Sequence, residues 1–194
     1  MSEILVNTIK KADGTGSLTV PADTGTVLTT ATAASSIPGS GNLTGADVWR
    51  LTADLTSNGD ITSNLERADD SSSGLIGTGM TESSGIFTFP ETGIWQVAVM
   101  ISYTSVSGNI DSIFVDTSVS SDGGSSYDFV TTTCAGIDAS GAQAVGSAGF
   151  ALVDVTNATN FRVKFTLSSL TVGSLIGQTG YNRTAFSFIR LGDT

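Results

Sequence analysis

The strongest constraint on the fold lies in residues 94–103, IWQVAVMISY. The odd positions, from Trp95 to Tyr103, carry large apolar side chains. Because successive side chains of a β-strand point to opposite faces, this period of two predicts a strand with one deeply buried face. The other face has no charge, so we expect it to pack closely against a second surface. Its residues are small or weakly polar: Gln96, Ala98, Met100 and Ser102.

The last strand signal, TAFSFIRL at residues 184–191, is apolar on both faces. Phe186 and Phe188 point one way, whereas Ile189 and Leu191 point the other. A strand of this kind is expected to be buried on both faces, and in a thin sandwich a subunit interface would provide the second cover. The two strands together give a set of predicted interface residues: Gln96, Ala98, Met100, Phe186, Phe188 and Ile189.

The composition after residue 46 is typical of an all-β domain. Val, Ile, Ser, Thr and Gly recur, and no segment has the periodicity of an amphipathic helix. The segment FRVKFTLS, residues 161–168, alternates apolar with polar side chains. We expect about eight to ten strands in an antiparallel sandwich over residues 46–194.

Residues 1–45 differ from the rest, because short apolar runs alternate with Gly, Asp and Pro. The Asp13-Gly14 pair favours a small hairpin, and residues 29–42 have the composition of a linker. This segment holds too few large side chains to bury a core alone. We therefore expect an extended anchor that docks on another surface. Its predicted contact residues are Leu5, Val6, Ile9, Leu18, Val20 and Val27.

Charge and hydropathy exclude several classes of partner. The net charge is −10, and a surface of that sign disfavours nucleic acid. No run of about 18 apolar residues is present, so no membrane span is expected. The N-terminus lacks the pattern of a secretory signal, and Cys134 is the single cysteine. These features favour assembly inside a cell followed by work outside it, as in a virus particle.

The sequence also argues against catalysis. It has no His, and Cys134 has no neighbouring base, so we interpret that cysteine as a buried small hydrophobe. Asp69 and Asp70 are adjacent, which on an extended chain directs them to opposite sides. The turn segments DGTG, NGD and SDGG lack full calcium-loop spacing. We expect no enzyme, no catalytic residues, no cofactor and no metal site, with a structural Ca²⁺ at an oligomer apex as an open alternative.

Exposed aromatic side chains could bind a host surface glycan. Trp49 and Trp95 both fall on the apolar side of their strands, so we expect them in the core. Tyr127 lies beside the turn SSDGGSS and is the predicted exposed contact.

One segment resembles a known family. GIFTFPETGIW is similar to the G-x-F-x-x-P-x-x-G-x-[YFW] segment of C1q/TNF-like jelly rolls. TAFSFIRL resembles the closing strand of that family but lacks its Gly. The resemblance covers residues 46–194 and implies a homotrimer. The matching positions are Gly85, Phe87, Pro90, Gly93 and Trp95.

The N-terminus is similar to the starts of tailed-phage virion proteins, particularly marine ones, through Leu5, Val6, Asn7 and Ile9. We therefore expect a virion structural protein with the anchor at 1–45 and the jelly roll at 46–194. A chain of 194 residues leaves little room for a fibre shaft, which favours a homotrimeric capsid decoration (cement or head-fibre) protein. Its partners would be itself and the major capsid protein or another virion protein. The alternatives are a tail-fibre or receptor-binding adhesin, and a C1q/TNF-like extracellular ligand.

Overall fold

The computed structural model describes residues 8–10, 17–19, 43–105, 108–139 and 143–194. The chain divides into two compact units, Met1–Asn42 and Leu43–Thr194. The boundary predicted between residues 45 and 46 lies close to this division, and the first strand of the second unit begins at Ala46.

The first unit contains the hairpin that the sequence predicts. Strand β1 (Thr8–Lys10) pairs antiparallel with β2 (Ser17–Thr19), which sets Ile9 opposite Leu18. These are two of the six predicted anchor residues. The other four lie outside the described residues: Leu5, Val6, Val20 and Val27.

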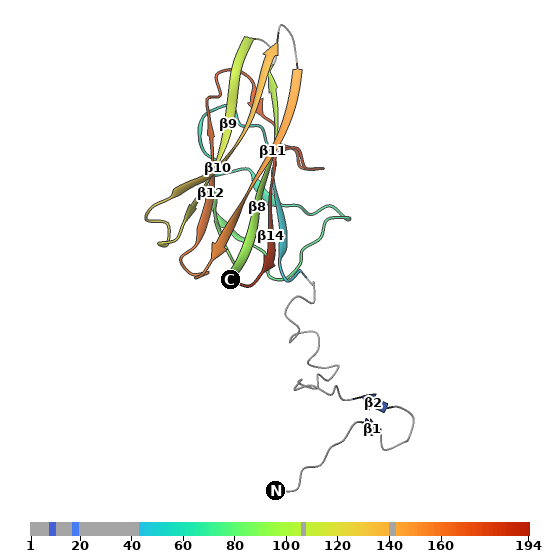
Figure 1. Cartoon of the computed structure of the whole chain (residues 1–194). Helices are drawn as coiled ribbons and strands as arrows, with labels where there is room; N and C mark the ends of the chain where they lie inside the picture. The colour runs from blue at the N-terminus through green and yellow to red at the C-terminus, as the bar shows by residue number, and fades with distance from the viewer. Residues whose placement is uncertain (1–7, 11–16, 20–42, 106–107, 140–142) are drawn as a thin grey trace. The chain divides into compact units, whose positions relative to one another are not determined.

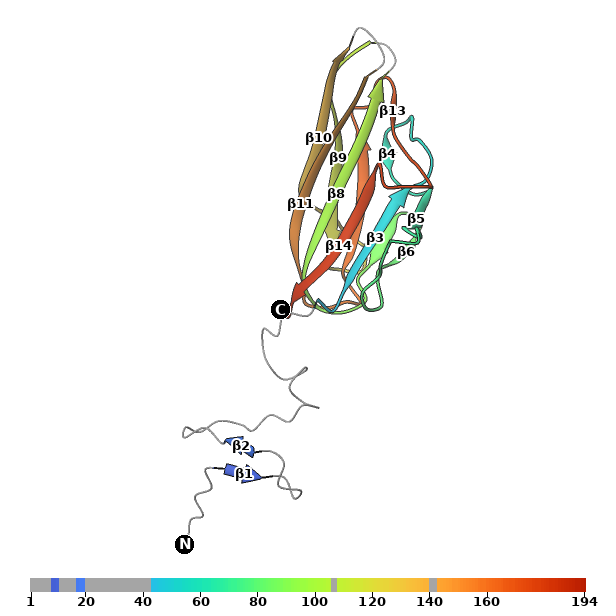
Figure 2. The same ribbon diagram turned by 90° about the vertical axis from the view of Figure 1, so that its right-hand side faces the viewer.

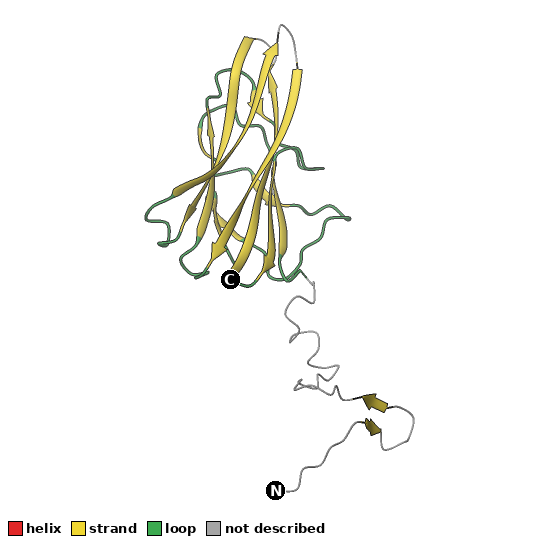
Figure 3. Cartoon of the chain, viewed as in Figure 1, coloured by secondary structure: helices red, strands yellow, loops and turns green. Residues whose placement is uncertain are grey.

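The second unit is a sandwich of two six-stranded antiparallel sheets (Figures 1 and 3). The β8 sheet has the order β11-β8-β14-β3-β5, with β13 also paired to β8. The bounds of its strands are β3 Ala46–Leu51, β5 Leu65–Arg67, β8 Gly93–Ser105, β11 Gln143–Val155, β13 Ser174–Leu175 and β14 Ala185–Gly192.

The β9 sheet has the order β10-β9-β12-β7-β6, with β4 also paired to β12. Its strands are β4 Gly59–Asp60, β6 Thr81–Ser83, β7 Ile86–Thr88, β9 Gly108–Ser120, β10 Asp128–Ala139 and β12 Arg162–Ser168. The described residues form no helix, and none of them therefore provides a helix that could cross a membrane.

The alternation along β8 is confirmed. Its odd-numbered side chains from Trp95 to Tyr103 are at most 1% exposed, and they form one wall of the core. The opposite wall includes Phe87 and Phe165 from the β9 sheet. Period two is thus the direct cause of the sandwich, because it supplies one continuous apolar face that a second sheet covers.

The closing strand contributes to the same core. The rings of Phe165 and Phe186 are stacked with centroids 4.3 Å apart, and those of Phe87 and Phe188 are 5.1 Å apart. Phe186 and Phe188 are 0% exposed. Both were predicted at a subunit interface, and the structure corrects this, because the chain's own second sheet covers them completely. The other side of the strand, with Ile189 half-buried and Leu191 exposed, is not covered in the same way.

The family-like motif also has a physical explanation. Gly85 has φ +83° and Gly93 has φ +142°, which are backbone conformations that residues other than glycine rarely adopt. A Cβ atom at Gly85 would collide with the carbonyl of Ile61. Between these two turns, Phe87 and Phe89 enter the core, where Phe89 lies edge-on to Trp95 at 5.5 Å. The motif therefore places two aromatic rings in the core, and β8 begins at its second glycine.

Truncation of Phe188 tests its assignment to the core. Phe188→Ala should lower the free energy of unfolding by about 3–5 kcal/mol, because it removes a fully buried ring and leaves a cavity. Phe129→Ala, the same truncation at a side chain that is 61% exposed, should cost less than about 0.5 kcal/mol. Urea denaturation of both variants measures the difference. Equal and small losses would contradict the core position of Phe188.

Candidate functional site

The solvent-facing side of the β8 sheet carries a patch without charge, which ends on β11 at the exposed Asp154. Figure 2 shows β11, β8, β14 and β3 side by side across this sheet. The even-numbered residues of β8 point outward, and the register sets Phe150 beside Ala98 and Leu152 beside Gln96. On the other side of β8, Ser187 and Ile189 continue these rows.

Strand β3 completes the rows, because Val48 pairs with Ser187 and Ala46 with Ile189. A third row adds Met100 beside Ala148. None of these positions carries a charge, although the chain has 26 charged residues (18 acidic and 8 basic). We call this surface the uncharged face. It comprises Ala46, Val48, Gln96, Ala98, Met100, Ala148, Phe150, Leu152, Ser187 and Ile189.

Large apolar side chains on the uncharged face are open to solvent. Phe150 and Leu152 are each 62% exposed, and Met100 is 41% exposed. Their neighbours on β8, β14 and β3 carry no charge: Gln96 and Ser187 are polar, whereas Ala46, Val48, Ala98 and Ile189 are apolar. Exposed apolar side chains that gather on one face indicate an interaction surface.

The structure places four of the predicted interface residues on this face. Met100 is exposed, and the other three, Gln96, Ala98 and Ile189, are half-buried. Phe186 and Phe188 belong to the core instead. Phe150 and Leu152, the most exposed large side chains of the face, are absent from the sequence prediction. The signal was present in AGFALVDV, where Phe150 and Leu152 alternate with Val153 and Val155.

Arg50 lies where the uncharged face ends. It occupies the row of Ala185 and Met100 but is 1% exposed, because a turn folds over it. Its Nε donates to Glu66 at 2.7 Å and its Nη1 to Asp70 at 2.7 Å, and Nη2 also pairs with Asp69. Asp69 and Asp70 thus converge on one guanidinium, which corrects the expectation that they face opposite ways. The chain leaves β5 at Arg67 and bends at Asp70, which breaks the extended geometry on which that expectation depended.

The positive charge of Arg50 is balanced by the carboxylates that contact it. Burial alone lowers the pKa of Arg50, but hydrogen bonds and charge attraction from Glu66 and Asp70 outweigh burial and raise it. On the core side of β3, Asp47 accepts hydrogen bonds from Arg67 Nε at 2.9 Å and the Met80 amide at 2.7 Å. The charges of β3 are therefore satisfied by residues 66–80 and leave the uncharged face neutral.

Tyr127 lies away from this face. It is half-buried, not fully exposed as predicted, and Lys164 Nζ from the β9 sheet lies 4.8 Å from its ring centroid. Cys134 is exposed on β10, which corrects its interpretation as a buried hydrophobe. In the described part of the chain, no group of three or more Cys, Asp or Glu side chains is arranged to hold a metal ion.

Comparisons with known proteins identify the fold. No family model matches the sequence, and no curated protein does. Solved structures match the fold. Eiger TNF from S. frugiperda has a TM-score of 0.55 and 13% identity, and the match covers 79% of this chain and 96% of that one. Murine APRIL at pH 5.0 has a TM-score of 0.55 and 8% identity, with 76% and 98% covered.

A second structure of murine APRIL, at pH 8.0, gives a TM-score of 0.53 at 8% identity, again with 76% and 98% covered. These identities are low, so the comparisons show the fold alone. The predicted fold class, an all-β antiparallel jelly roll of the C1q/TNF-like type, is confirmed.

Replacement of Arg50 tests whether this arginine holds the turn of residues 66–73 at the border of the uncharged face. Arg50→Met should lower the free energy of unfolding by about 1–3 kcal/mol, since it leaves three carboxylates together without a cation. The cost stays below that of a fully buried pair because Asp69 is 76% exposed and can hydrate. Residues 66–73 should also become sensitive to limited proteolysis.

The control is Arg183→Met, which removes an arginine whose Nε donates a hydrogen bond to the hydroxyl of the exposed Tyr181 at 3.3 Å. It should leave both stability and proteolysis unchanged. If Arg50→Met behaves like this control, the carboxylates do not depend on Arg50.

Proposed function

We propose that this chain is a non-enzymatic structural protein that self-associates through the uncharged face. The observation that carries the proposal is the exposure of Met100, Phe150 and Leu152 on a surface without charge. Burial of apolar area drives association, and the absence of charge removes the desolvation cost that charged groups would add. The small residues beside them allow a partner to approach the sheet closely.

The proposed assembly is a homotrimer. In the proposed ring, the β11 side of one copy, which carries Phe150 and Leu152, packs against the β14 and β3 side of the next copy. A head-to-tail contact of this kind between identical chains closes into a ring when the rotation between copies fits. The resemblance to C1q/TNF-like domains implies three copies, and the match to TNF-like structures supports that number.

We further propose that the trimer is a virion component, and specifically a capsid decoration protein docked by its N-terminal segment. The support is the resemblance of Leu5, Val6, Asn7 and Ile9 to phage virion N-termini, together with the β1–β2 hairpin. The partner would be the major capsid protein or another virion protein. A tail-fibre adhesin would use the same trimer in fewer copies.

The second candidate is a C1q/TNF-like extracellular ligand. The observation that favours it is the similarity of the jelly roll to Eiger TNF and APRIL. The two candidates share the trimer and differ in the role of the N-terminal segment, which would attach a decoration protein to its particle.

Introduction of a charge on the β11 part of the uncharged face tests self-association. Phe150→Asp should abolish trimers while leaving the fold intact, because it places a charge in a contact from which water is excluded. Sedimentation should then give the single-chain mass of 19.7 kDa instead of three times that value. Leu75→Asp, at another exposed apolar side chain that is 44% exposed, should stay trimeric. If Phe150→Asp forms trimers that are as stable as those of the wild type, the uncharged face is not the surface through which the chain self-associates.

Truncation tests the virion role. Deletion of residues 1–30 should leave a folded, trimeric jelly roll that no longer joins particles. Quantitative mass spectrometry of purified particles should give hundreds of full-length copies per particle if the protein decorates a capsid, and tens if it forms fibres. Normal incorporation of the truncated chain would contradict the anchor, and complete absence of the protein from particles would favour the extracellular ligand.

A further inference from the structure

The solvent-facing side of the β9 sheet has a different chemistry from the uncharged face. Thr132 on β10 and Thr166 on β12 both lie opposite Asp116 on β9. Asp60 on β4 pairs in turn with Thr166. Directly paired residues of antiparallel strands share a face, so hydroxyl and carboxylate groups alternate across four strands. We call these four residues the polar row.

Hydrogen bonds fix the carboxylates of the polar row. Thr132 Oγ1 donates to Asp116 Oδ1 at 2.7 Å, and Thr166 Oγ1 donates to Asp60 Oδ1 at 2.6 Å. Lys164 Nζ donates to Asp60 Oδ2 at 2.9 Å. The hydrogen bond from Thr166 and then that from Lys164 lower the pKa of Asp60, which keeps this carboxylate ionised. The second oxygen of Asp116 accepts no hydrogen bond from the described groups and stays available.

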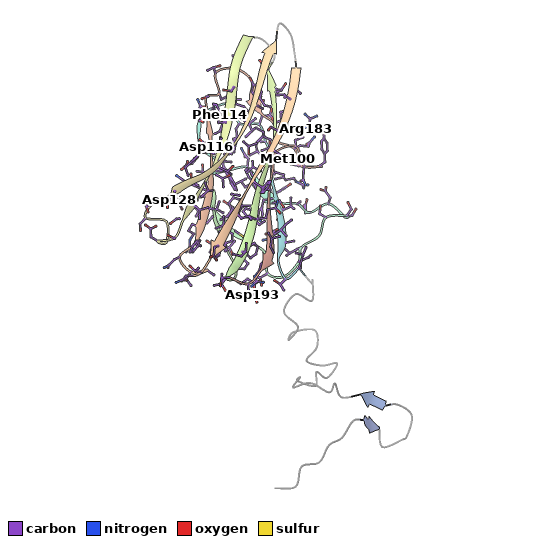
Figure 4. The ribbon with its side chains drawn as sticks, viewed as in Figure 1. Met100, Phe114, Asp116, Asp128, Arg183 and Asp193 are labelled. Carbon is purple, nitrogen blue, oxygen red and sulfur yellow. The ribbon has the colours of Figure 1, made fainter. Side chains whose placement is uncertain are left out.

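Aromatic rings flank the polar row on both sides. On one side Phe129, which is 61% exposed, shares its row with Ser118 and Lys164, and the ring of Tyr127 lies against the same lysine. On the other side, Phe114 is half-buried and pairs with the exposed Cys134. Figure 4 places Phe114 and Asp116 on the side of the sandwich away from Met100 and Arg183.

This combination matches the chemistry of a sugar chain. Aromatic rings pack against the apolar C–H faces of pyranose rings, while carboxylates and an ammonium bond their hydroxyl groups. Neighbouring strands lie about 4.8 Å apart, close to the length of one sugar ring, so successive polar groups can meet successive units. The fixed side chains also lose little conformational entropy on binding.

The charge of the surface selects among glycans. Asp60 and Asp116 both face the row, and the chain carries a net charge of −10, so a sulphated or uronic-acid polymer would be repelled. We propose that the polar row and its flanking rings, Phe114, Tyr127 and Phe129, bind a neutral glycan chain. Asp116 accepts hydrogen bonds from a hydroxyl pair, and Phe129 packs against the face of a sugar ring.

The inference goes beyond the proposed function and stands without it. The glycan surface belongs to the β9 sheet, whereas self-association uses the β8 sheet, so a homotrimer would present three glycan surfaces at once. Binding by three linked sites raises the overall affinity for a polymer without any new contact.

Affinity electrophoresis of the full chain tests the proposal. The gels contain one probe each: dextran, yeast mannan, laminarin or soluble starch as neutral polymers, and alginate or dextran sulphate as anionic ones. We expect retardation by at least one neutral polymer and by neither anionic one. Asp116→Asn keeps the shape of the side chain and its bond from Thr132, and should weaken binding at least about tenfold through loss of the charge.

Phe129→Ala should weaken binding to a similar extent, whereas Asp154→Asn, at an exposed acid of the β8 sheet, should bind like wild type. Circular dichroism checks that each variant is folded. No retardation by any neutral polymer, or equal retardation of wild type, Asp116→Asn and Phe129→Ala, would overturn the proposal. Phe150→Asp separates it from self-association, because a monomer should still bind, with a loss of avidity alone.

Discussion

The packing of the odd-numbered side chains of β8 against the phenylalanines of the β9 sheet determines the rest of this structure. Because Trp95 and its odd-numbered companions are used in the core, the even-numbered residues must face outward. The same pairing commits Phe186 and Phe188 of β14 to the core and turns Ser187 and Ile189 to the surface. The composition of the uncharged face is therefore a consequence of core packing.

Period two along β8 could be read directly from the sequence, and so could the all-β class and the outward position of Gln96, Ala98 and Met100. The error at β14 has a physical reason. When both faces of a strand are apolar, periodicity separates the faces but cannot tell which one the chain covers by itself. Phe186 and Phe188 pair with rings from distant strands, and that pairing depends on the register of the whole sheet.

Other features depend on turns, which local sequence describes poorly. Asp69 and Asp70 both reach Arg50 because the chain turns after β5, so that alternation no longer applies. Cys134 is exposed because it alternates with the buried Thr133 and Ala135 and so lies on the outer face of β10. The polar row could not be predicted from local sequence either, because Asp60 and Thr166 are more than a hundred residues apart and meet only through the register of their strands.

The two outer faces of the sandwich differ in chemistry, and we propose that they differ in role. The uncharged face is mostly apolar, and it suits contact with copies of the same chain. The other is polar and rigid, with exposed rings, and suits contact with a hydrated polymer. A small domain that self-associates on one side and binds on the other gains affinity by repetition, which fits a protein of a particle surface.

Sedimentation equilibrium of the wild-type chain tests directly whether the uncharged face holds copies of the chain together. A homotrimer would have a mass of three times 19.7 kDa, and we expect that mass to persist on dilution through the low micromolar range. A single-chain mass at every concentration would contradict it, because Phe150 and Leu152 would then remain in water with no partner copy to cover them.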